Sequence, residues 1–258
     1  MPPAAPVIAL LGFGEAGSAF GRDLLDRDVT VRVYDPKVVA GPPATVADDE
    51  AGAVRGADLV LSVNSAHDAA PALAAGIAGA RPGTVWADMN TASPAAKQRL
   101  AATAGEHGIG FADIAIMAPV PGKGLSVPML VSGTAAEDVA DMLRGLGATI
   151  DVQPGDAGEA AQRKLLRSVF FKGLAAAVFE ALEAGRAAGC ERWLHDNIVD
   201  ELTGADETTV DRLVSGTVKH ARRRADEMAA AAEMLTDLGV DPAVAGATRD
   251  LLVRLSRE

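Results

Sequence analysis

The sequence predicts an α/β protein, with a doubly wound parallel sheet in its first part and an all-α second part. Two observations support this. Short apolar runs alternate with Ala-rich stretches of helical spacing as far as about residue 152, and strands separated by helices form parallel sheets with right-handed crossovers. After Pro154 no convincing strand follows, and the helical stretches are divided by Gly189, Gly204, Gly239 and Pro242. We therefore expect two domains, 1–153 and 154–258.

The expected elements follow in order. Residues 7–11 form an apolar run suited to a strand buried on both faces, and a Gly-rich turn and a helix to about Leu25 come next. A β-rich run covers 29–34, and further strands end near Asn64, Asp88 and Asp113. Late strands are expected at 128–133 and 148–151. A long helix starting near Gly158 is apolar on several sides, so it must be buried within its domain or against another subunit.

Composition excludes several classes of protein. The net charge of −11 argues against a nucleic-acid or anionic-membrane surface, either of which needs a basic face. The single cysteine, Cys190, excludes an internal disulfide and a multi-Cys metal site, and the four scattered His suggest no metal. The first six residues have no basic region of a signal peptide, and the apolar runs are too short to span a membrane. We expect a cytoplasmic protein.

The turn after the first strand carries a G-x-G-x-x-G pattern. Gly12 allows a tight turn, Gly14 lets the backbone approach a pyrophosphate, and Gly17 lets the following helix pack on the strand. Free N–H groups at the helix start would face the phosphates. The alternative is a Gly-rich turn that binds no dinucleotide. The expected cofactor-binding residues are Gly12, Phe13, Gly14, Glu15, Ala16, Gly17, Asp35, Lys37, Val63, Asn64 and Asn90.

Asp35 decides the expected cofactor. It stands 18 residues after Gly17, at the end of the second strand, where a carboxylate accepts hydrogen bonds from the adenosine ribose. Because this carboxylate would repel a 2′-phosphate, we expect NAD. Lys37 could neutralise such a phosphate, so NADP is also possible.

Three further segments carry a resemblance. Residues 88–94 look like a D-x-S-T-x-S-P motif, and residues 155–164 match G-x-x-G-x-G-x-x-x-K, with Ala160 in place of the third Gly. With 111–124 as a substrate loop, the chain resembles the β-hydroxyacid dehydrogenase superfamily, which includes 3-hydroxyisobutyrate and 6-phosphogluconate dehydrogenases. Its second half looks like a branch of phosphogluconate-dehydrogenase-like proteins. The resemblance implies a Rossmann domain plus a helical domain, a homodimer, and an active site in the cleft between the domains.

The resemblance also makes Lys164 the catalytic lysine. A lysine in a partly desolvated cleft can take the hydroxyl proton of an alcohol or donate one to a carbonyl, and its charge stabilises the developing oxyanion. The alternative is an ordinary surface lysine. Ser168, where the superfamily commonly has Asn, would contact substrate or bond back to the preceding turn. Lys172 would meet an anionic group of the substrate or remain a solvated charge.

The substrate loop departs from the superfamily. Its usual D-A-P-V-S-G-G is replaced by a stretch that contains Met117, Ala118 and Pro119, and the Ser-Gly-Gly that clasps a carboxylate is absent. We expect a stiffer, more apolar substrate site, and neither 3-hydroxyisobutyrate nor 6-phosphogluconate fits it well. The basic cluster 219–224 would bind an anion or pair with nearby acids. His195 is expected at the surface or in packing, and Cys190 as a buried filler.

These observations favour an oxidoreductase that transfers a hydride between a nicotinamide cofactor and a hydroxy acid, or a related alcohol or carbonyl substrate. Two alternatives stay open. One is an imine reductase on the same fold, although imine reductases usually carry another proton donor in place of Lys164. The other is a non-catalytic NAD(P)-binding protein.

Overall fold

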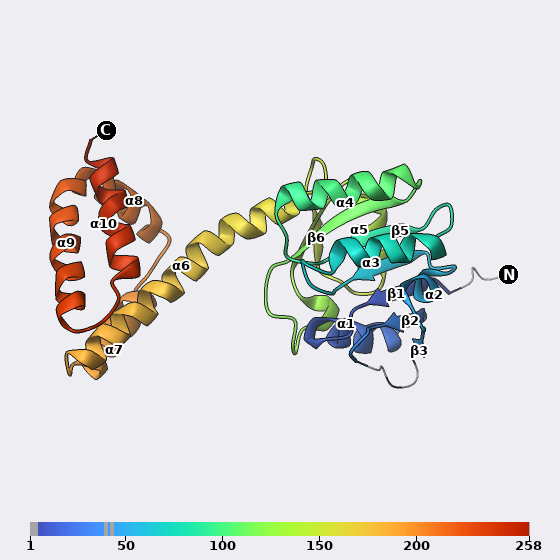
Figure 1. Ribbon diagram of the computed structural model, residues 1–258, viewed down its shortest axis with the longest axis horizontal. Coiled ribbons are helices and arrows are strands. Elements are labelled where there is room, and N and C mark those ends of the chain that lie inside the picture. Colours follow the sequence, from blue (N-terminus) through green and yellow to red (C-terminus); the bar gives the residue numbers. More distant parts are fainter. Residues whose placement is uncertain (1–4, 39–40, 42–43, 258) are drawn as a thin grey trace. The chain divides into compact units, whose positions relative to one another are not determined.

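A computed structural model describes residues 5–38, 41 and 44–257. The chain divides into two compact units, the first ending at Arg167 and the second starting at Ser168 (Figure 1). This division falls inside a long helix, whereas the boundary expected from the sequence, at 153–154, falls where the last strand ends.

The first unit is built on one sheet that confirms the predicted α/β class. Over the described residues it has eight strands in the order β3-β2-β1-β4-β5-β6-β7-β8. All neighbouring strands are parallel except β6 and β7, which are antiparallel. The strands are β1 (Val7–Leu11), β2 (Thr30–Tyr34), β3 (Thr45–Val46), β4 (Leu59–Ser62), β5 (Val85–Asp88), β6 (Gly110–Ile116), β7 (Met129–Ser132) and β8 (Ile150–Val152).

Two apolar cores cover the two faces of this sheet, which is why its strands read as continuous apolar runs. Alternate residues of β1 point to opposite faces, so Ile8 and Leu10 lie in one core while Ala9 and Leu11 lie in the other. The covering helices are α1 (Glu15–Leu25), α2 (Glu50–Val54), α3 (Ala69–Gly76), α4 (Pro94–Glu106) and α5 (Ala136–Gly145).

Local sequence explains where these helices begin. The Asp49 side chain accepts the Gly52 N–H at 2.6 Å and starts α2. Ser93 caps α4 in the same way, through the Ala96 N–H at 3.2 Å, and Pro94 at the first helical position has the φ that a helix start needs.

The second unit is helical throughout its described residues, as predicted. It contains the later part of α6 (Glu159–Ala187), then α7 (Glu191–Thr203), α8 (Thr209–Lys219), α9 (Ala221–Asp237) and α10 (Ala243–Leu255). A small core lies between α6, α9 and α10, made of Ala184, Ala232, Leu235, Val240 and Ala245. The buried Glu180 accepts the N–H groups of Val244 and Ala245 at 2.6 and 2.8 Å, so a side chain from α6 satisfies the start of α10.

Large apolar side chains of this unit face outward. Val169 and Phe179 on α6 are 75% and 72% exposed, and α8 presents Val210, Val214 and Val218. Such a concentration of exposed apolar side chains is unusual for a monomer. Among the described helices, none combines the length and apolar character needed to cross a membrane.

Candidate cofactor and active site

The Gly-rich turn between β1 and α1 needs two of its glycines for the fold itself. Gly12 has φ +98°, its N–H donates to Tyr34 O at 2.9 Å, and a Cβ there would lie 2.6 Å from the Val63 carbonyl oxygen. A Cβ at Gly17 would lie 2.1 Å from the Gly12 carbonyl oxygen. Any side chain at either position would therefore collide with backbone.

Gly14 differs, because a Cβ there would meet nothing within 4 Å. It is the N-cap of α1 and provides no side-chain cap, so the first N–H groups of α1 gain no partner from it. An open approach to helix N–H groups is what an anionic pyrophosphate requires. The turn thus fits the dinucleotide that its sequence predicts.

Asp35, at the end of β2, joins this turn to the next loop. Its carboxylate accepts the N–H groups of Phe13 and Lys37, each at 2.7 Å, and of Val38 at 3.0 Å. Burial by itself would raise the pKa of Asp35, but these three hydrogen bonds and the Lys37 charge hold that pKa below its usual value. Asp35 and Lys37 line a pocket of about 290 Å³ together with Gly12, Gly14 and Asn64. A carboxylate thus stands where an adenosine ribose is expected.

A second pocket, of about 260 Å³, lies at the carboxyl ends of the central strands. Six of the predicted cofactor-binding residues line it: Gly14, Glu15, Ala16, Val63, Asn64 and Asn90. Met89, Thr91, Ile116 and Lys164 also line this pocket. The backbone N–H of Phe13 donates to Asp35, and Gly17 contributes through the close packing of α1 against Gly12. The carboxyl edge of a doubly wound sheet is where such folds bind ligands.

Lys164 extends from the second turn of α6, and the start of α6 is tied to the sheet. Asp113, in the middle of β6, accepts the N–H groups of Gly158 and Ala161 at 3.2 and 2.8 Å. Gly158 has φ +108°, and a Cβ there would lie 3.0 Å from the Pro94 carbonyl oxygen. Gly158 thus permits the chain before α6 to approach the start of α4 closely.

A buried ion triad supports this arrangement and was missed from the sequence. Lys97 Nζ of α4 lies 2.5 Å from Asp88 Oδ2 and 2.9 Å from Asp113 Oδ1, and all three side chains are inaccessible to solvent. Asp88 and Asp113 are register partners on β5 and β6. The detectable signal was the pair of Asp residues in two successive apolar runs, which together need a cation once both are buried.

Asn90 is oriented by the same triad. Its Nδ2 donates to Asp88 Oδ1 at 2.6 Å and to Ser62 Oγ at 3.1 Å. Both donors of the amide are therefore used by the protein, while its buried Oδ1 has no protein partner within the described residues. Asn90 thus lines the same pocket as Lys164 with both amide donors already engaged by the protein.

The predicted substrate loop also meets Lys164. Met117, Ala118 and Pro119 line a pocket of about 350 Å³, together with Lys164 and Arg167. The Asp23 carboxylate of α1 accepts the Leu125 N–H at 2.7 Å and anchors the far end of this loop. Ser168 and Lys172 follow on α6 within the second unit and are not among the residues that line this pocket.

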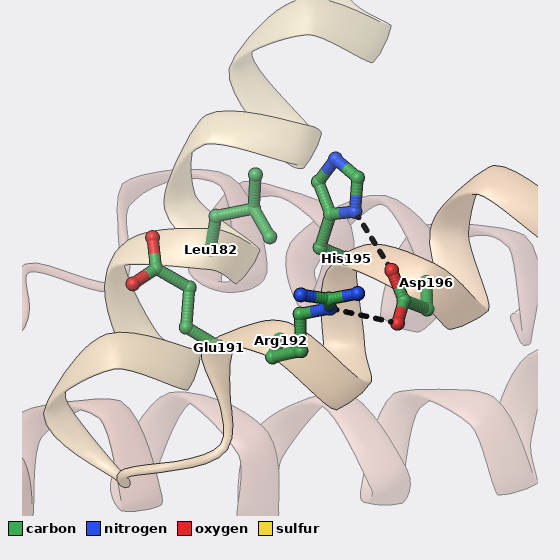
Figure 2. A pocket seen from close by; sticks show the side chains of 5 residues that line it. All are labelled: Leu182, Glu191, Arg192, His195 and Asp196. Atoms are coloured by element: carbon green, nitrogen blue, oxygen red, sulfur yellow. Dashed lines mark hydrogen bonds and ion pairs between the residues drawn. The ribbon is translucent and has the colours of Figure 1, made fainter.

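Several charged groups of the second unit pair with neighbours on the same helices. A pocket of about 420 Å³ is lined by residues of α6 and α7, and Figure 2 shows that Arg192 and His195 there both contact Asp196, each at 3.2 Å. These two bonds lower the pKa of Asp196. In the basic cluster, Arg223 pairs with Glu227, and Arg224 donates to Thr217 Oγ1 at 3.0 Å.

His195 is exposed, in agreement with a surface role, but the expectation for Cys190 was wrong. Cys190 is exposed, because it lies in the turn between α6 and α7, directly after Gly189 with φ +73°. Among the described residues, no group of three or more His, Cys, Asp or Glu side chains is placed to hold a metal ion.

Three solved structures resemble this chain over nearly its whole length. A conserved hypothetical protein from Sinorhizobium meliloti 1021 is 29% identical, with 97% of this chain and 88% of that chain covered and a TM-score of 0.64. A conserved protein of unknown function with structural similarity to 3-hydroxyacid dehydrogenases is 26% identical, with 97% of both chains covered and a TM-score of 0.61. An imine reductase from Myxococcus stipitatus in complex with NADP+ is 20% identical, with 98% and 94% covered and a TM-score of 0.80.

Family models match both parts of the chain. Residues 186–255 match the model described as Domain of unknown function (DUF1932). Residues 7–153, more than half of the chain, match the NAD binding domain of 6-phosphogluconate dehydrogenase. The protein is therefore a member of the 6-phosphogluconate dehydrogenase-like family of NAD-binding proteins, with the dehydrogenase and reductase fold shared by 3-hydroxyacid dehydrogenases and imine reductases.

Proposed function

We propose that this protein transfers a hydride between a nicotinamide cofactor and a hydroxy acid or related alcohol or carbonyl substrate, with Lys164 as the acid and base. One observation carries the proposal. Lys164 lines both the pocket at the Gly-rich turn and the pocket of the substrate loop, which supports a role where the expected cofactor and the expected substrate meet.

Different cofactor-binding residues bind different parts of the dinucleotide. Gly12, Gly14 and the start of α1 receive the pyrophosphate, and Asp35 accepts hydrogen bonds from the adenosine ribose. We propose NAD as the preferred cofactor, since the Asp35 carboxylate would repel a 2′-phosphate. Lys37 on the same pocket leaves NADP as the second possibility. Titration with NADH and NADPH tests this, and tighter binding of NADPH would contradict it.

Bound nicotinamide supplies the hydride or accepts it. In the direction of reduction, the Lys164 ammonium donates a proton to the oxygen on which charge develops, and in oxidation its amine removes the hydroxyl proton. Replacing Lys164 by Met should lower kcat by on the order of 10² or more. The dissociation constant of the cofactor should stay within about twofold, because Asp35 and the Gly-rich turn are unchanged. Wild-type turnover in Lys164→Met would refute the assignment.

An imine reductase is the second candidate, favoured by the apolar lining of the substrate pocket and by the fold. A panel of substrates separates the two activities. Hydroxy acids are assayed with NAD and NADP, and the matching oxo acids and cyclic imines with NADH and NADPH. Tight cofactor binding without turnover of any member would favour a non-catalytic NAD(P)-binding protein.

We further propose that the protein is a homodimer located in the cytoplasm. The exposed apolar side chains of α6 and α8, among them Val169, Phe179 and Val214, support a second copy as the partner of the helical unit. Analytical ultracentrifugation over a wide concentration range tests this. Replacing Val169 and Phe179 by Glu should produce monomers, and an unchanged sedimentation coefficient would argue for another use of this face.

A further inference from the structure

A chain of hydrogen bonds runs from the buried ion triad to the cofactor pockets. Lys97 Nζ donates to the Asp88 carboxylate at 2.5 Å, and this carboxylate accepts the Asn90 amide nitrogen at 2.6 Å. The same nitrogen donates to Ser62 Oγ at 3.1 Å, and Ser62 Oγ donates to Asn64 Oδ1 at 3.0 Å. Ser62 ends β4 and is the register partner of Asp88, which ends β5. The pairing of two neighbouring strands thus assembles the chain of bonds.

Each bond in this chain fixes the direction of the next. A carboxylate only accepts hydrogen bonds, so Asn90 must turn its amide nitrogen toward Asp88. Ser62 has a single hydroxyl proton and its oxygen receives the Asn90 nitrogen, so this proton goes to the oxygen of Asn64. Asp88 and Ser62 are inaccessible to solvent and Asn90 is 6% exposed, so water has little access to compete. Asn64 therefore turns its oxygen toward Ser62 and its NH₂ group away from it.

Asn64 stands where the two cofactor pockets meet. It lines both the Asp35 pocket and the pocket that contains Lys164, and Gly14 and Val63 line both pockets as well. Of these three shared residues, only Asn64 has a polar side chain. A dinucleotide that fills both pockets must pass them with the part between its two bases. That part carries oxygen acceptors on the pyrophosphate and on the nicotinamide ribose.

We propose that the NH₂ group of Asn64 donates a hydrogen bond to an oxygen of this middle part of the dinucleotide. Ser62 and Asn90 are positioning residues, because they hold Asn64 in the orientation that presents a donor. The buried pair of Lys97 and Asp88 sets that orientation, so the ion triad serves cofactor binding as well as stability. This inference rests on the proposed function, since it requires a bound nicotinamide dinucleotide.

Titration of the full-length protein with ADP and with ADP-ribose tests the inference without requiring turnover. ADP ends at the pyrophosphate, and ADP-ribose adds the second ribose. Asn64→Leu should weaken ADP-ribose binding about tenfold, because one hydrogen bond to the ligand is lost. An equal loss for ADP assigns the bond to the pyrophosphate, and an unchanged ADP affinity assigns it to the ribose. Asn64→Asp should weaken binding further, since it keeps the oxygen that accepts from Ser62 and turns a second oxygen toward the pocket.

A double-mutant cycle separates positioning from a general effect on the fold. Ser62→Ala should weaken ADP-ribose binding about threefold to tenfold in the wild-type background. In the Asn64→Leu background it should change the affinity by less than about twofold, because no donor is left to orient. Thr84→Ala is the matched control, since the buried Thr84 hydroxyl donates to the Ala57 carbonyl oxygen at 2.9 Å just before the opposite end of β5. This variant should lower the melting temperature and keep the wild-type affinity.

The inference fails if Asn64→Leu binds ADP-ribose as wild type does. It also fails if Ser62→Ala causes the same loss of affinity in both backgrounds. Failure of the proposed function looks different. A wild type that binds ADP-ribose, with variants that behave as described, but turns over no member of the substrate panel contradicts the proposed reaction and still supports the inference. A wild type that binds neither ADP-ribose nor NAD overturns both.

Discussion

The buried triad of Lys97, Asp88 and Asp113 gives the sharpest test of the structure. Replacing Lys97 by Met keeps the length of the side chain but leaves two buried carboxylates without their shared cation. Removing one partner of a buried ion pair destabilises proteins by about 3–5 kcal/mol. With a urea dependence of about 2 kcal/mol per molar, the unfolding midpoint of the first unit should fall by roughly 2 M.

The two tryptophans make this measurable. Trp86 is buried on β5 of the first unit, whereas Trp193 is exposed on α7 of the second. In a Trp193→Phe background, fluorescence therefore reports the unfolding of the first unit alone. Lys123→Met, at an exposed loop position, is the control and should shift the midpoint little. A shift for Lys97→Met no larger than for this control would refute the reasoning.

Three further predictions concern other parts of the chain. Gly14→Ala should leave the melting temperature nearly unchanged but weaken cofactor binding more than tenfold. Gly17→Ala should lower both the melting temperature and the cofactor affinity, because its Cβ meets the Gly12 carbonyl oxygen. Calorimetry measures the first quantity and cofactor titration the second. The pKa of Asp35 is lower in the folded than in the unfolded chain, so the ionised carboxylate stabilises the fold above about pH 4, and this stabilisation is lost as the pH falls through the folded pKa. Asp35→Asn should therefore make the free energy of unfolding depend less steeply on pH in the acid range. An unchanged dependence would contradict the assignment. Glu180→Gln should destabilise the second unit by about 1–2 kcal/mol through weaker bonding to the first N–H groups of α10, and thermal melts followed by circular dichroism should show an unaltered first unit.

The fold class was predictable because burial on both faces leaves a direct trace in the sequence. The strands at 7–11 and 59–62 lie in two cores at once and read as apolar runs, and Gly12 and Gly17 mark a turn that tolerates no side chain. The short β3 was missed because two residues give no periodicity. The antiparallel direction of β7 was also beyond reach, since strand direction depends on pairing and not on local pattern.

The site was only partly predictable for a related reason. Lys164 and Met117 stand in segments that carry the family resemblance, Asn64 stands at an expected strand end, and the structure brings all three to adjoining pockets. Lys97 and Arg167 stand in no motif. A lysine near the start of a helix is normally solvated, and only the register pairing of Asp88 on β5 with Asp113 on β6 makes Lys97 an internal cation. Arg167 lines a pocket with the loop 117–120, which lies far from it in sequence, so only the fold reveals that it belongs to the site.

Gly14 and Gly17 also differ in what an evolving lineage could do with them. The fold itself requires the absence of a side chain at Gly17, whereas at Gly14 only a bound dinucleotide would require it. A descendant that stopped using a dinucleotide could replace Gly14 at almost no cost and would still have to keep Gly17. The two glycines of one turn would then diverge at different rates, and a substituted residue 14 beside an intact residue 17 would mark a homologue that has kept the architecture and abandoned its cofactor.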